Sequence, residues 1–584
     1  MKIVNRWWHQ RWAPLSVLIL MSLIMIVPQL LTGSTIVGSD GIFHFNRIYD
    51  AAKQISNWNF SYFQTNYGFQ QSGRIVNAVY GPYFAYLTGF LLVIFRSWYH
   101  FQLVTTFAVY LIGGWGMYRL TRIAGAHRGA GLITALIFMN VGWLPRWGFN
   151  QNMNGIGAAL MPYVIACGIQ MVHDQVRPIH IVQLTLIMSV LIETHVLSTL
   201  MAVILLVPFW IVGMWRSDHR LLMIRNTAIA IGLTLLLTAN VWGGMLSLYA
   251  NNSLALPHSF QLAQNTLHIT KLMDHRDSIS IYLIIIFIWQ VGLLLWHRRQ
   301  VTRINWMISG LGIIFLWLTS RFFPWQTVNH AIPVLSQVLQ FPVRITIVAY
   351  PLLLCGLALS LSLPTKLPQG KDLMLPIMIL AVLAVAVPNI TNISQRSEQV
   401  QHRKVLKNFG GLLLLDNSPK VLRKTLNSKH PGALLELAEK HSSDYLPING
   451  KQGEGQQNPG SIYKRQILLG HQFFSFTVLS HGRLELQWHA DNKGWQMTPV
   501  VSYHDSTLTL NGKKLAKSEY RRTHINVPIV YAHKGTNKLI IRYATPTWVG
   551  VLIGASLASW FGLGCYGLYE FRKRCGLRRI ELEH

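Results

Sequence analysis

Three side chains with complementary chemistry follow the first apolar stretch of this 584-residue chain. In the segment GSDGIFHFNRI, a helix beginning near Gly41 would place Asp40, His44 and Arg47 on one face. A carboxylate, an imidazole and a guanidinium at a membrane surface can transfer protons and bind an anion. The residues are equally consistent with a helix cap at Ser39 or Asp40, followed by an amphipathic surface helix with solvated charges.

Arg344 is the second candidate, because it follows Phe341 and Pro342 at the start of a predicted membrane crossing. Proline suits the first turn of a helix, so Arg344 is expected near the level of the lipid headgroups. Its guanidinium could hold a phosphate through two parallel hydrogen bonds, or it could be an interfacial anchor. Arg321 and His330 in the same predicted outer loop are weaker candidates for the same task.

Glu193 and His195 stand in a short turn between two apolar stretches and are predicted to face outward at the membrane surface. They could join Asp40 in an acceptor or metal site, or simply shape the turn. Asp274, His275 and Asp277 could bind a cation, but their spacing matches no specific template. No cofactor is therefore assigned, and a divalent cation stays possible. The polar loop GFNQNMNG at 148–155 offers amides suited to sugar hydroxyls, or is an ordinary turn.

The elements that must position these side chains are mostly membrane helices. The chain is 51% hydrophobic and only 12% charged, and residues 1–395 hold eight of its 21 acidic residues. Soluble domains carry about 25% charged residues, so a soluble multidomain enzyme and a disordered chain are both excluded. Nucleic-acid binding does not fit either, because the basic residues of this part lie between apolar stretches.

Twelve apolar stretches are predicted to cross the membrane. They are residues 13–32, 101–119, 129–145, 154–173, 179–194, 196–214, 226–245, 279–296, 304–320, 343–363, 373–391 and 547–568. The basic linkers fall on the cytoplasmic side only if residues 78–95 form a re-entrant or juxtamembrane helix. Both termini are then cytoplasmic, and residues 33–100, 146–153, 246–278, 321–342 and 396–545 are on the outer face of a multi-pass cell-membrane protein.

Residues 396–545 are predicted to form an exported domain between the membrane domain, 1–395, and the final helix and basic tail, 546–584. Residues 402–441 are expected to be helical, with LLELAEKH as a good helix former. Seven short runs then predict strands of a β-sandwich: SIYKRQILL, QFFSFTVLS, RLELQWHA, QMTPVVSY, STLTLNG, HINVPIVYA and NKLIIRYA. The domain carries 22 Lys and Arg against ten Asp and Glu, which could attract anionic wall polymers or lipid headgroups, or be a solvated surface.

The segment GSDGIFHFNRI after the first membrane helix resembles a group of polytopic proteins labelled 6-pyruvoyl-tetrahydropterin-synthase-related. They are similar to YfhO-like proteins and belong to the GT-C glycosyltransferase superfamily. Further matching pieces occur in the family's order along almost the whole chain: NYG at 66–68, YGPYFAYL at 80–87, ETHVLST at 193–199, QFPVR at 340–344 and SDYLP at 443–447.

The resemblance implies a membrane enzyme that transfers a sugar from a polyprenyl-phosphate donor to a cell-wall polymer or glycolipid acceptor on the outer face. Asp40 would then act as general base or orient the acceptor, assisted by His44, Glu193 and His195. Arg344, with Arg47 and Arg321, would stabilise the phosphate leaving group. The chain lacks an Asp-x-Asp pair and an adjacent acidic pair after Asp40, which puts metal dependence in doubt.

Two other functions fit a protein of this kind. A transporter or flippase for lipid-linked glycans would have many helices and basic groups near phosphates, but it predicts charges along a path through the bundle. The ionisable residues gather instead at the predicted helix ends. A non-enzymatic cell-envelope assembly protein would act mainly through its exported domain.

Overall fold

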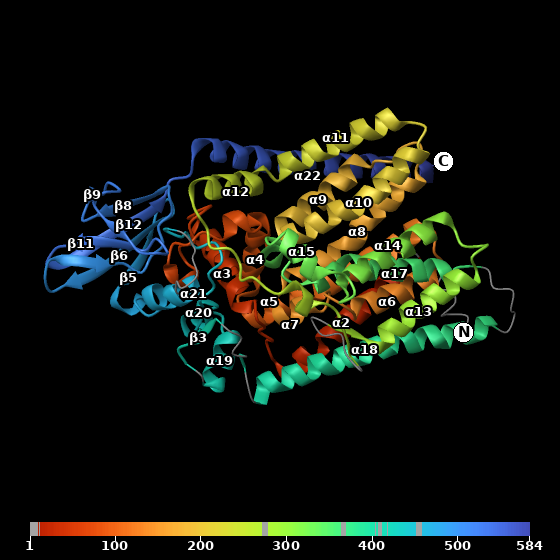
Figure 1. Ribbon diagram of the computed structural model, residues 1–584, viewed down its shortest axis with the longest axis horizontal. Helices are drawn as coiled ribbons and strands as arrows, with labels where there is room; N and C mark the ends of the chain where they lie inside the picture. Colours follow the sequence, from red (N-terminus) through yellow and green to blue (C-terminus); the bar gives the residue numbers. More distant parts are fainter. Residues whose placement is uncertain are drawn as a thin grey trace.

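The computed structural model describes residues 10, 12–270, 278–363, 370–402, 405–406, 411–416, 418–450 and 458–583. Helices dominate as far as residue 402, and sheets dominate residues 475–543. Figure 1 shows the helices as one bundle, with the β-rich part at one end of the molecule. The bundle helices include α2 (Ala13–Thr32), α5 (Trp98–Ala124), α6 (Arg128–Met139), α8 (Met153–His173), α9 (Ile181–Thr194), α10 (Val196–Arg216), α11 (Arg220–Leu237), α13 (Ile281–Trp296), α14 (Arg303–Thr319), α17 (Thr346–Ser360) and α18 (Gly370–His402).

Seven helical segments of the described residues are long and apolar enough to cross a membrane. They are Ala13–Thr32, Met153–His173, Val196–Arg216, Arg220–Leu237, Pro342–Ser360, Pro376–His402 and Thr547–Lys573. Five shorter apolar helices have 10–17 residues: Pro82–Phe95, Arg128–Met139, Ile181–Thr194, Ile281–Trp296 and Arg303–Thr319. The chain is therefore a helical membrane protein, and the count of twelve crossings stays a prediction. The helix α4 (Pro82–Phe95) lies against α3 (Gly41–Asn57) and α5, and its predicted re-entrant placement also stays a prediction.

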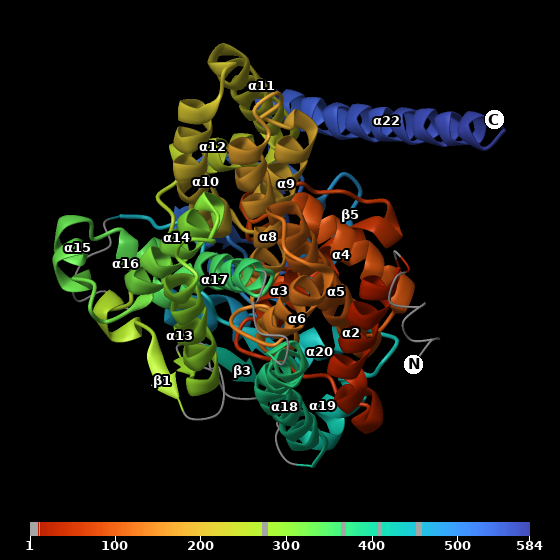
Figure 2. The ribbon, with the colours of Figure 1, turned by 90° about the vertical axis from the view of Figure 1, so that its right-hand side faces the viewer.

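The predicted span 226–245 is divided in the structure, because α11 ends at Leu237 and α12 (Ala239–Asn251) begins after Thr238. The final helix α22 (Thr547–Glu583) supports this break. The Ser556 hydroxyl and the Trp560 indole donate to the Leu237 carbonyl at 2.6 and 2.9 Å. A carbonyl freed inside an apolar region needs such a donor. In Figure 2, α22 continues past α11 and α12 and extends away from the bundle.

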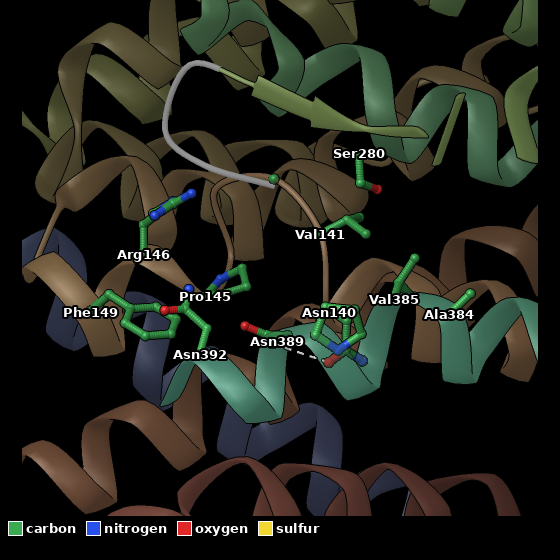
Figure 3. Close-up of a pocket in the computed structure, with 12 residues that line it drawn as sticks. Asn140, Val141, Pro145, Arg146, Phe149, Ser280, Ala384, Val385, Asn389 and Asn392 are labelled. Carbon is green, nitrogen blue, oxygen red and sulfur yellow. Dashed lines mark hydrogen bonds between the residues drawn. The ribbon is translucent and has the colours of Figure 1, made fainter. Parts of the chain in front are cut away.

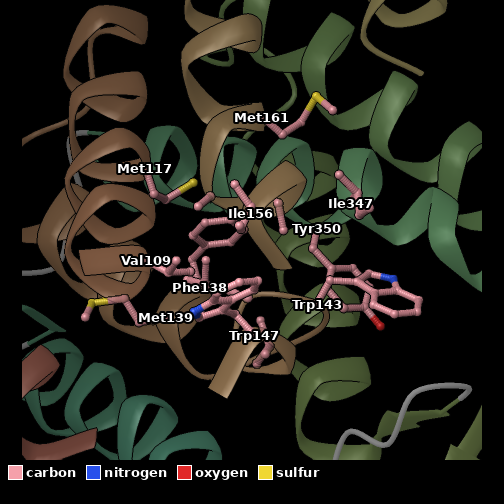
Figure 4. Packing of buried hydrophobic residues seen from close by; sticks show 14 of the residues in the cluster. Val109, Met117, Phe138, Met139, Trp143, Trp147, Ile156, Met161, Ile347 and Tyr350 are labelled. Atoms are coloured by element: carbon pink, nitrogen blue, oxygen red, sulfur yellow. The ribbon is translucent and has the colours of Figure 1, made fainter. Parts of the chain in front are cut away.

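The core of the bundle is packed where α5, α6, α8 and α17 meet (Figure 4). Residues such as Met117, Phe138, Trp147 and Tyr350 are almost completely buried there. Gly116 permits the close approach of α5 to α8, because a β-carbon at this position would lie 2.4 Å from the Tyr163 ring. Small residues at helix contacts serve this purpose in membrane proteins.

The β-rich part is a sandwich of two antiparallel sheets, which confirms the predicted β-rich C-terminal domain. The larger sheet has the order β5-β6-β12-β8-β9 and the smaller β10-β11-β7. Leu484, Leu508, Val530 and Ile541 are buried in the core that these sheets share. The strands are β5 (Ser475–Leu479), β6 (Arg483–Ala490), β7 (Gly494–Met497), β8 (Ser506–Leu510), β9 (Lys513–Lys514), β10 (Arg521–Arg522), β11 (Pro528–Ala532) and β12 (Gly535–Tyr543).

Three local predictions about the C-terminal part were wrong. The predicted strand QMTPVVSY is one of them, because β7 ends at Met497 and residues 498–503 lie outside any strand. Residues 402–441 do not form continuous helix, since only α19 (Pro419–Leu426) and α20 (Gly432–Leu437) are helical among the residues that the structure describes between 405 and 441. The run LLELAEKH is divided because β4 (Ala438–Lys440) pairs with β3 (Leu412–Leu414), so sheet pairing overrides helix propensity. The run SIYKRQILL is helical and not a strand, with α21 (Pro459–Tyr463) capped by the Asn458 side chain.

The segment between α3 and α4 is packed against the C-terminal part over a common core. Phe63, Ile75, Leu446 and Tyr503 belong to one buried cluster. The Arg74 guanidinium donates to the carbonyls of Ser442 and Asp444, and the Tyr503 hydroxyl accepts from the Ile75 amide at 3.0 Å. These contacts place residues 438–445 beside α3, where the candidate site lies.

Candidate functional site

Asp40 lies at the start of α3, as expected, but its carboxylate does not cap the helix. It accepts instead from the side-chain amide of Asn152 at 2.7 Å. Asn152 begins α8, and its own oxygen accepts from the Asn154 amide at 2.9 Å. The polar loop 148–155 therefore orients the Asp40 carboxylate.

The helix α3 is buried, which excludes the alternative of an amphipathic surface helix with solvated charges. Ile42, His44, Phe45 and Arg47 are at most 3% exposed. The Phe45 ring stacks on Trp98 with ring centres 4.0 Å apart. The apolar positions that would suit a membrane surface are covered by protein, because the C-terminal part and α4 lie over this helix.

Four of the predicted site residues line one cavity of about 380 Å³. They are Asp40, His44, His195 and Arg344. The cavity also includes residues from α8, α12, the segment 256–257 and the segment 440–445, so it is built from elements far apart in the sequence. Its other lining residues are Phe43, Val79, Tyr80, Asn152, Met153, Asn154, Ile192, Thr194, Val196, Leu197, Leu200, Met245, Tyr249, Leu256, Pro257, Gln337, Val338, Gln340, Lys440, Ser442, Asp444 and Tyr445.

Arg344 is oriented by its own short helix, η4 (Pro342–Ile345), with Pro342 at the first position as expected. Its guanidinium donates to the Leu339 carbonyl at 3.0 Å and to the Gln340 side chain at 2.9 Å. The guanidinium carbon lies 4.9 Å from the centre of the Phe341 ring. These contacts hold a positive charge at the cavity wall.

Lys440 and Asp444 are cavity residues that the sequence reasoning did not assign. The Lys440 ammonium donates to the Ser39 carbonyl at 2.7 Å, next to Asp40. Asp444 belongs to the SDYLP segment, which provided a signal, whereas Lys440 is one basic residue among 22 in its region. Only the pairing of β4 with β3 and the contacts of Arg74 bring both residues to the cavity.

The electrostatics of the cavity favour a basic carboxylate. Burial raises the pKa of Asp40, while the charges of Lys440 and Arg344 and the hydrogen bond from Asn152 oppose the rise. Burial also lowers the pKa of His44 well below its usual range, reinforced by Arg47. His44 is therefore neutral at pH 7. Its Nδ1 accepts from Arg47 at 3.2 Å, which leaves the proton on Nε2.

His195 lies between α9 and α10, and its Nδ1 lies 2.8 Å from the Ser198 hydroxyl. Glu193 does not line the cavity. Its carboxylate accepts from the Asn240 side chain at 2.6 Å and from the Tyr83 amide at 3.1 Å. Glu193 thus ties α9 to α4 and α12, behind the wall that His195 forms.

Arg47 and Arg321 lie outside the cavity lining. Arg47 donates to Asn77 Oδ1 at 3.0 Å and to the Tyr80 carbonyl, and packs 4.4 Å from the centre of the Tyr80 ring. Arg47 therefore supports Tyr80 and His44 from the side that does not face the cavity. Arg321 is exposed and contacts the Phe322 ring, and His330 is exposed as well. The predicted cation ligands Asp274, His275 and Asp277 lie outside the described residues.

Among the described residues, no three His, Cys, Asp or Glu side chains come together to hold a metal ion. Asp40 and Asp444 both line the cavity, but a protein-held cation site needs more ligands than these two.

An apolar groove of about 350 Å³ lies beside the site among α8, α9, α10 and α11. Ile192 lines both this groove and the cavity, so the two spaces adjoin at that side chain. The groove is lined by Met171, Leu184, Met188, Ile192, Thr199, Val203, Leu206, Val207, Trp210, Thr227, Ala230, Ile231, Thr234 and Leu235.

A third space is small and polar (Figure 3). Asn140, Arg146, Ser280, Asn389 and Asn392 are among its lining residues, and its volume is about 20 Å³. The Asn389 amide donates to Asn140 Oδ1 at 3.1 Å across it. A space of this size holds about one water molecule. It is therefore too small to be a substrate site.

No protein-family model and no curated protein sequence matches this chain. Solved structures of two membrane transferases are similar to it. The oligosaccharyltransferase of Archaeoglobus fulgidus shares 14% identity with a TM-score of 0.34, over 67% of this chain and 56% of that one. The arabinofuranosyltransferase AftD from Mycobacteria shares 17% identity with a TM-score of 0.40, over 64% of this chain and 27% of that one. Because both TM-scores lie below 0.5, these similarities define neither the fold nor the activity of this chain.

Proposed function

We propose that this protein is a membrane glycosyltransferase that transfers a sugar from a polyprenyl-phosphate donor to a cell-envelope acceptor. The observation that carries the proposal is the meeting of a carboxylate, Asp40, with a guanidinium, Arg344, in one cavity beside an apolar groove. The resemblance of the GSDGIFHFNRI segment to GT-C proteins supports the same reaction class. The outer-face location of the cavity and of residues 396–545, and the cytoplasmic location of both termini, belong to the proposal.

The reaction requires one proton acceptor and one cation. As an acceptor hydroxyl attacks the anomeric carbon, a new C–O bond forms and the bond from that carbon to the phosphate oxygen breaks. Asp40 takes the hydroxyl proton, and its raised pKa suits a base. Arg344 stabilises the negative charge that develops on the departing phosphate.

Burial and the Arg344 charge lower the pKa of His195 to about 3, so His195 is neutral like His44, and both serve a different purpose in this scheme. His44 presents an Nε2 hydrogen, because Arg47 occupies its Nδ1. The amides of Asn152 and Asn154 line the same wall. Neutral donors and acceptors of this kind orient sugar hydroxyls without competing for the phosphate.

The apolar groove gives the donor a place for its hydrocarbon chain. Isoprenoid units are apolar, and the groove is lined almost entirely by aliphatic side chains, Trp210 and methionines. Because Ile192 borders both spaces, a chain in the groove would have its phosphate end at the cavity, where Arg344 stands.

The glycan and lipid-linked-sugar profile of cells that lack this protein tests the proposal. Wild-type protein is expected to restore a missing sugar modification, while Asp40→Asn and Arg344→Ala are expected to leave the lipid-linked precursor in excess. Asp218→Asn and Arg220→Ala are matched controls, since both residues are exposed near the start of α11 and neither lines the cavity. Restoration by both site variants, produced at wild-type levels, would overturn the mechanism and favour transport or scaffolding.

A further inference from the structure

The small sheet β10-β11-β7 carries a pair of exposed aromatic rings on the face that points away from the core of the sandwich. Trp495 on β7 and Tyr531 on β11 are directly opposed in the antiparallel register. They are 45% and 41% exposed, and their ring centres lie 5.5 Å apart at 81°. Their neighbours Val530 and Ala532 point the other way and are buried in the core of the sandwich. The aromatic side chains are therefore not needed to hold the sheets together.

A cation belongs to the same face. Arg521 on β10 pairs with Ile529 on β11, so both side chains share the face with Tyr531 and Trp495. The Arg521 guanidinium carbon lies 4.3 Å from the centre of the Trp495 ring. A cation–π contact attracts the guanidinium to the face of the ring. The chain thus presents two exposed aromatic rings, set nearly perpendicular to each other, and a positive charge that lies against one of them.

The surroundings of this face are basic. Lys493 precedes β7 and Lys534 follows β11, and both are exposed beside the paired row of Trp495 and Tyr531. Two acids lie near this face in sequence, Asp491 and Glu519, and Glu519 is paired with Lys513. The whole segment 396–545 carries 22 Lys and Arg against ten Asp and Glu. Charge complementarity therefore favours a negatively charged partner.

We infer that Trp495, Tyr531 and Arg521 form a binding face for an anionic polysaccharide. A pyranose ring has a face of C–H groups, which packs against the electron-rich face of an aromatic ring. A carboxylate or phosphate on the sugar would pair with Arg521 and the flanking lysines. Neighbouring sugar units along a polymer can contact both rings at once. A polymer therefore binds more tightly than a short saccharide that reaches one ring.

The position of the face suits polymer capture. Figure 1 shows β11 near the end of the molecule that is far from the helical bundle. The face lies apart from the cavity, since none of its residues is among the cavity lining. Binding here therefore does not depend on the proposed reaction, and it can be measured whether or not transfer occurs.

The test uses the purified full chain in detergent and immobilised polygalacturonate as an anionic probe, with dextran as a neutral polysaccharide. We expect binding to polygalacturonate that falls about tenfold in the double variant Trp495→Ala, Tyr531→Ala. Arg521→Gln is expected to weaken binding and to flatten its dependence on salt, because one charge contact is lost. Phe473→Ala and Lys514→Gln are matched controls at exposed positions outside this face, and both should bind like the wild type.

Two further probes decide the class of the partner. Polyacrylate carries carboxylates without sugar rings, so equal binding of polyacrylate, unaffected by the aromatic double variant, would overturn the inference. Binding of phosphatidylglycerol vesicles that depends on the same three residues would assign the face to a lipid surface and would overturn it as well. An unchanged melting temperature of each variant ensures that lost binding reports the face and not unfolding.

Discussion

Two polar spaces lie among the helices, and they differ in what surrounds their polar groups. The cavity at Asp40 has a volume of about 380 Å³. Its charged lining residues come from segments far apart in the sequence, such as those of Asp40 and Lys440. The chamber at Asn389 has about 20 Å³, and its amides bond to one another (Figure 3). A reaction site needs enough volume for a substrate and charged groups directed into that volume. A polar contact that only joins helices needs neither.

The largest effect is expected from Asp40→Asn. The variant keeps the shape of the side chain and a contact to Asn152, but it cannot accept a proton. Transfer of the sugar should fall by roughly 10²–10⁴-fold, which is the usual contribution of general base catalysis. The measurement is the rate of product formation from lipid-linked sugar in membranes. A rate within a few-fold of the wild type would remove the distinction between the cavity and the chamber.

Gly81→Ala is expected to damage the wall of the cavity. Gly81 has φ +75°, and an added β-carbon would lie 1.8 Å from the Glu193 carbonyl oxygen. The substitution combines backbone strain with a backbone clash, so we expect a loss of about 3 kcal/mol or more in unfolding free energy. Thermal unfolding in detergent measures it. Gly129→Ala is the control, because nothing lies within 4 Å of its added β-carbon; equal melting temperatures would contradict the prediction.

Lys440→Met should change the pH dependence of the transfer rate more than it changes the maximal rate. The Lys440 charge lowers the pKa of Asp40, against the larger effect of burial. The base works when ionised, so activity is present above the pKa of Asp40 and is lost as the pH falls through it. Removing Lys440 raises that pKa, and the acidic limb of the profile should move to higher pH.

Lys440→Arg serves as the control, because it retains the positive charge and should keep the limb near its original position. A profile that stays in place in Lys440→Met, with only a uniform loss of rate, would assign Lys440 to holding β4 against Ser39 alone.

The smallest effect is expected in the chamber. Asn389→Leu removes the hydrogen bond to Asn140, and hydrogen bonds between membrane helices contribute about 1 kcal/mol. We expect a small decrease in melting temperature and an unchanged rate of transfer. A loss of transfer as large as that of Asp40→Asn, in stably folded protein, would show that the chamber participates in the reaction.

The residues of the cavity differ in how well the sequence predicted them. Asp40 and Arg344 were found because a charge beside an apolar helix is conspicuous and costly. Glu193 was conspicuous for the same reason, yet its partners are Asn240 and the Tyr83 amide. An acid that braces two helices and an acid that faces a cavity produce the same local pattern. Lys440 gave no signal, because it is one of many basic residues in a polar region.

Composition and periodicity determined most of the helices and the sheet-rich end of this protein. Apolar runs long enough for membranes form helices wherever they lie, and most of the alternating runs after residue 475 form strands, because both patterns are local. Only the tertiary structure decided that Thr238 divides a helix, that α3 is buried, and that the LLELAEKH run ends in a strand. Each of these depends on a partner distant in the chain: α22 for Thr238, the 438–445 segment for α3 and β3 for β4. Contacts of this kind are absent from any local pattern, because they arise only when the chain has folded.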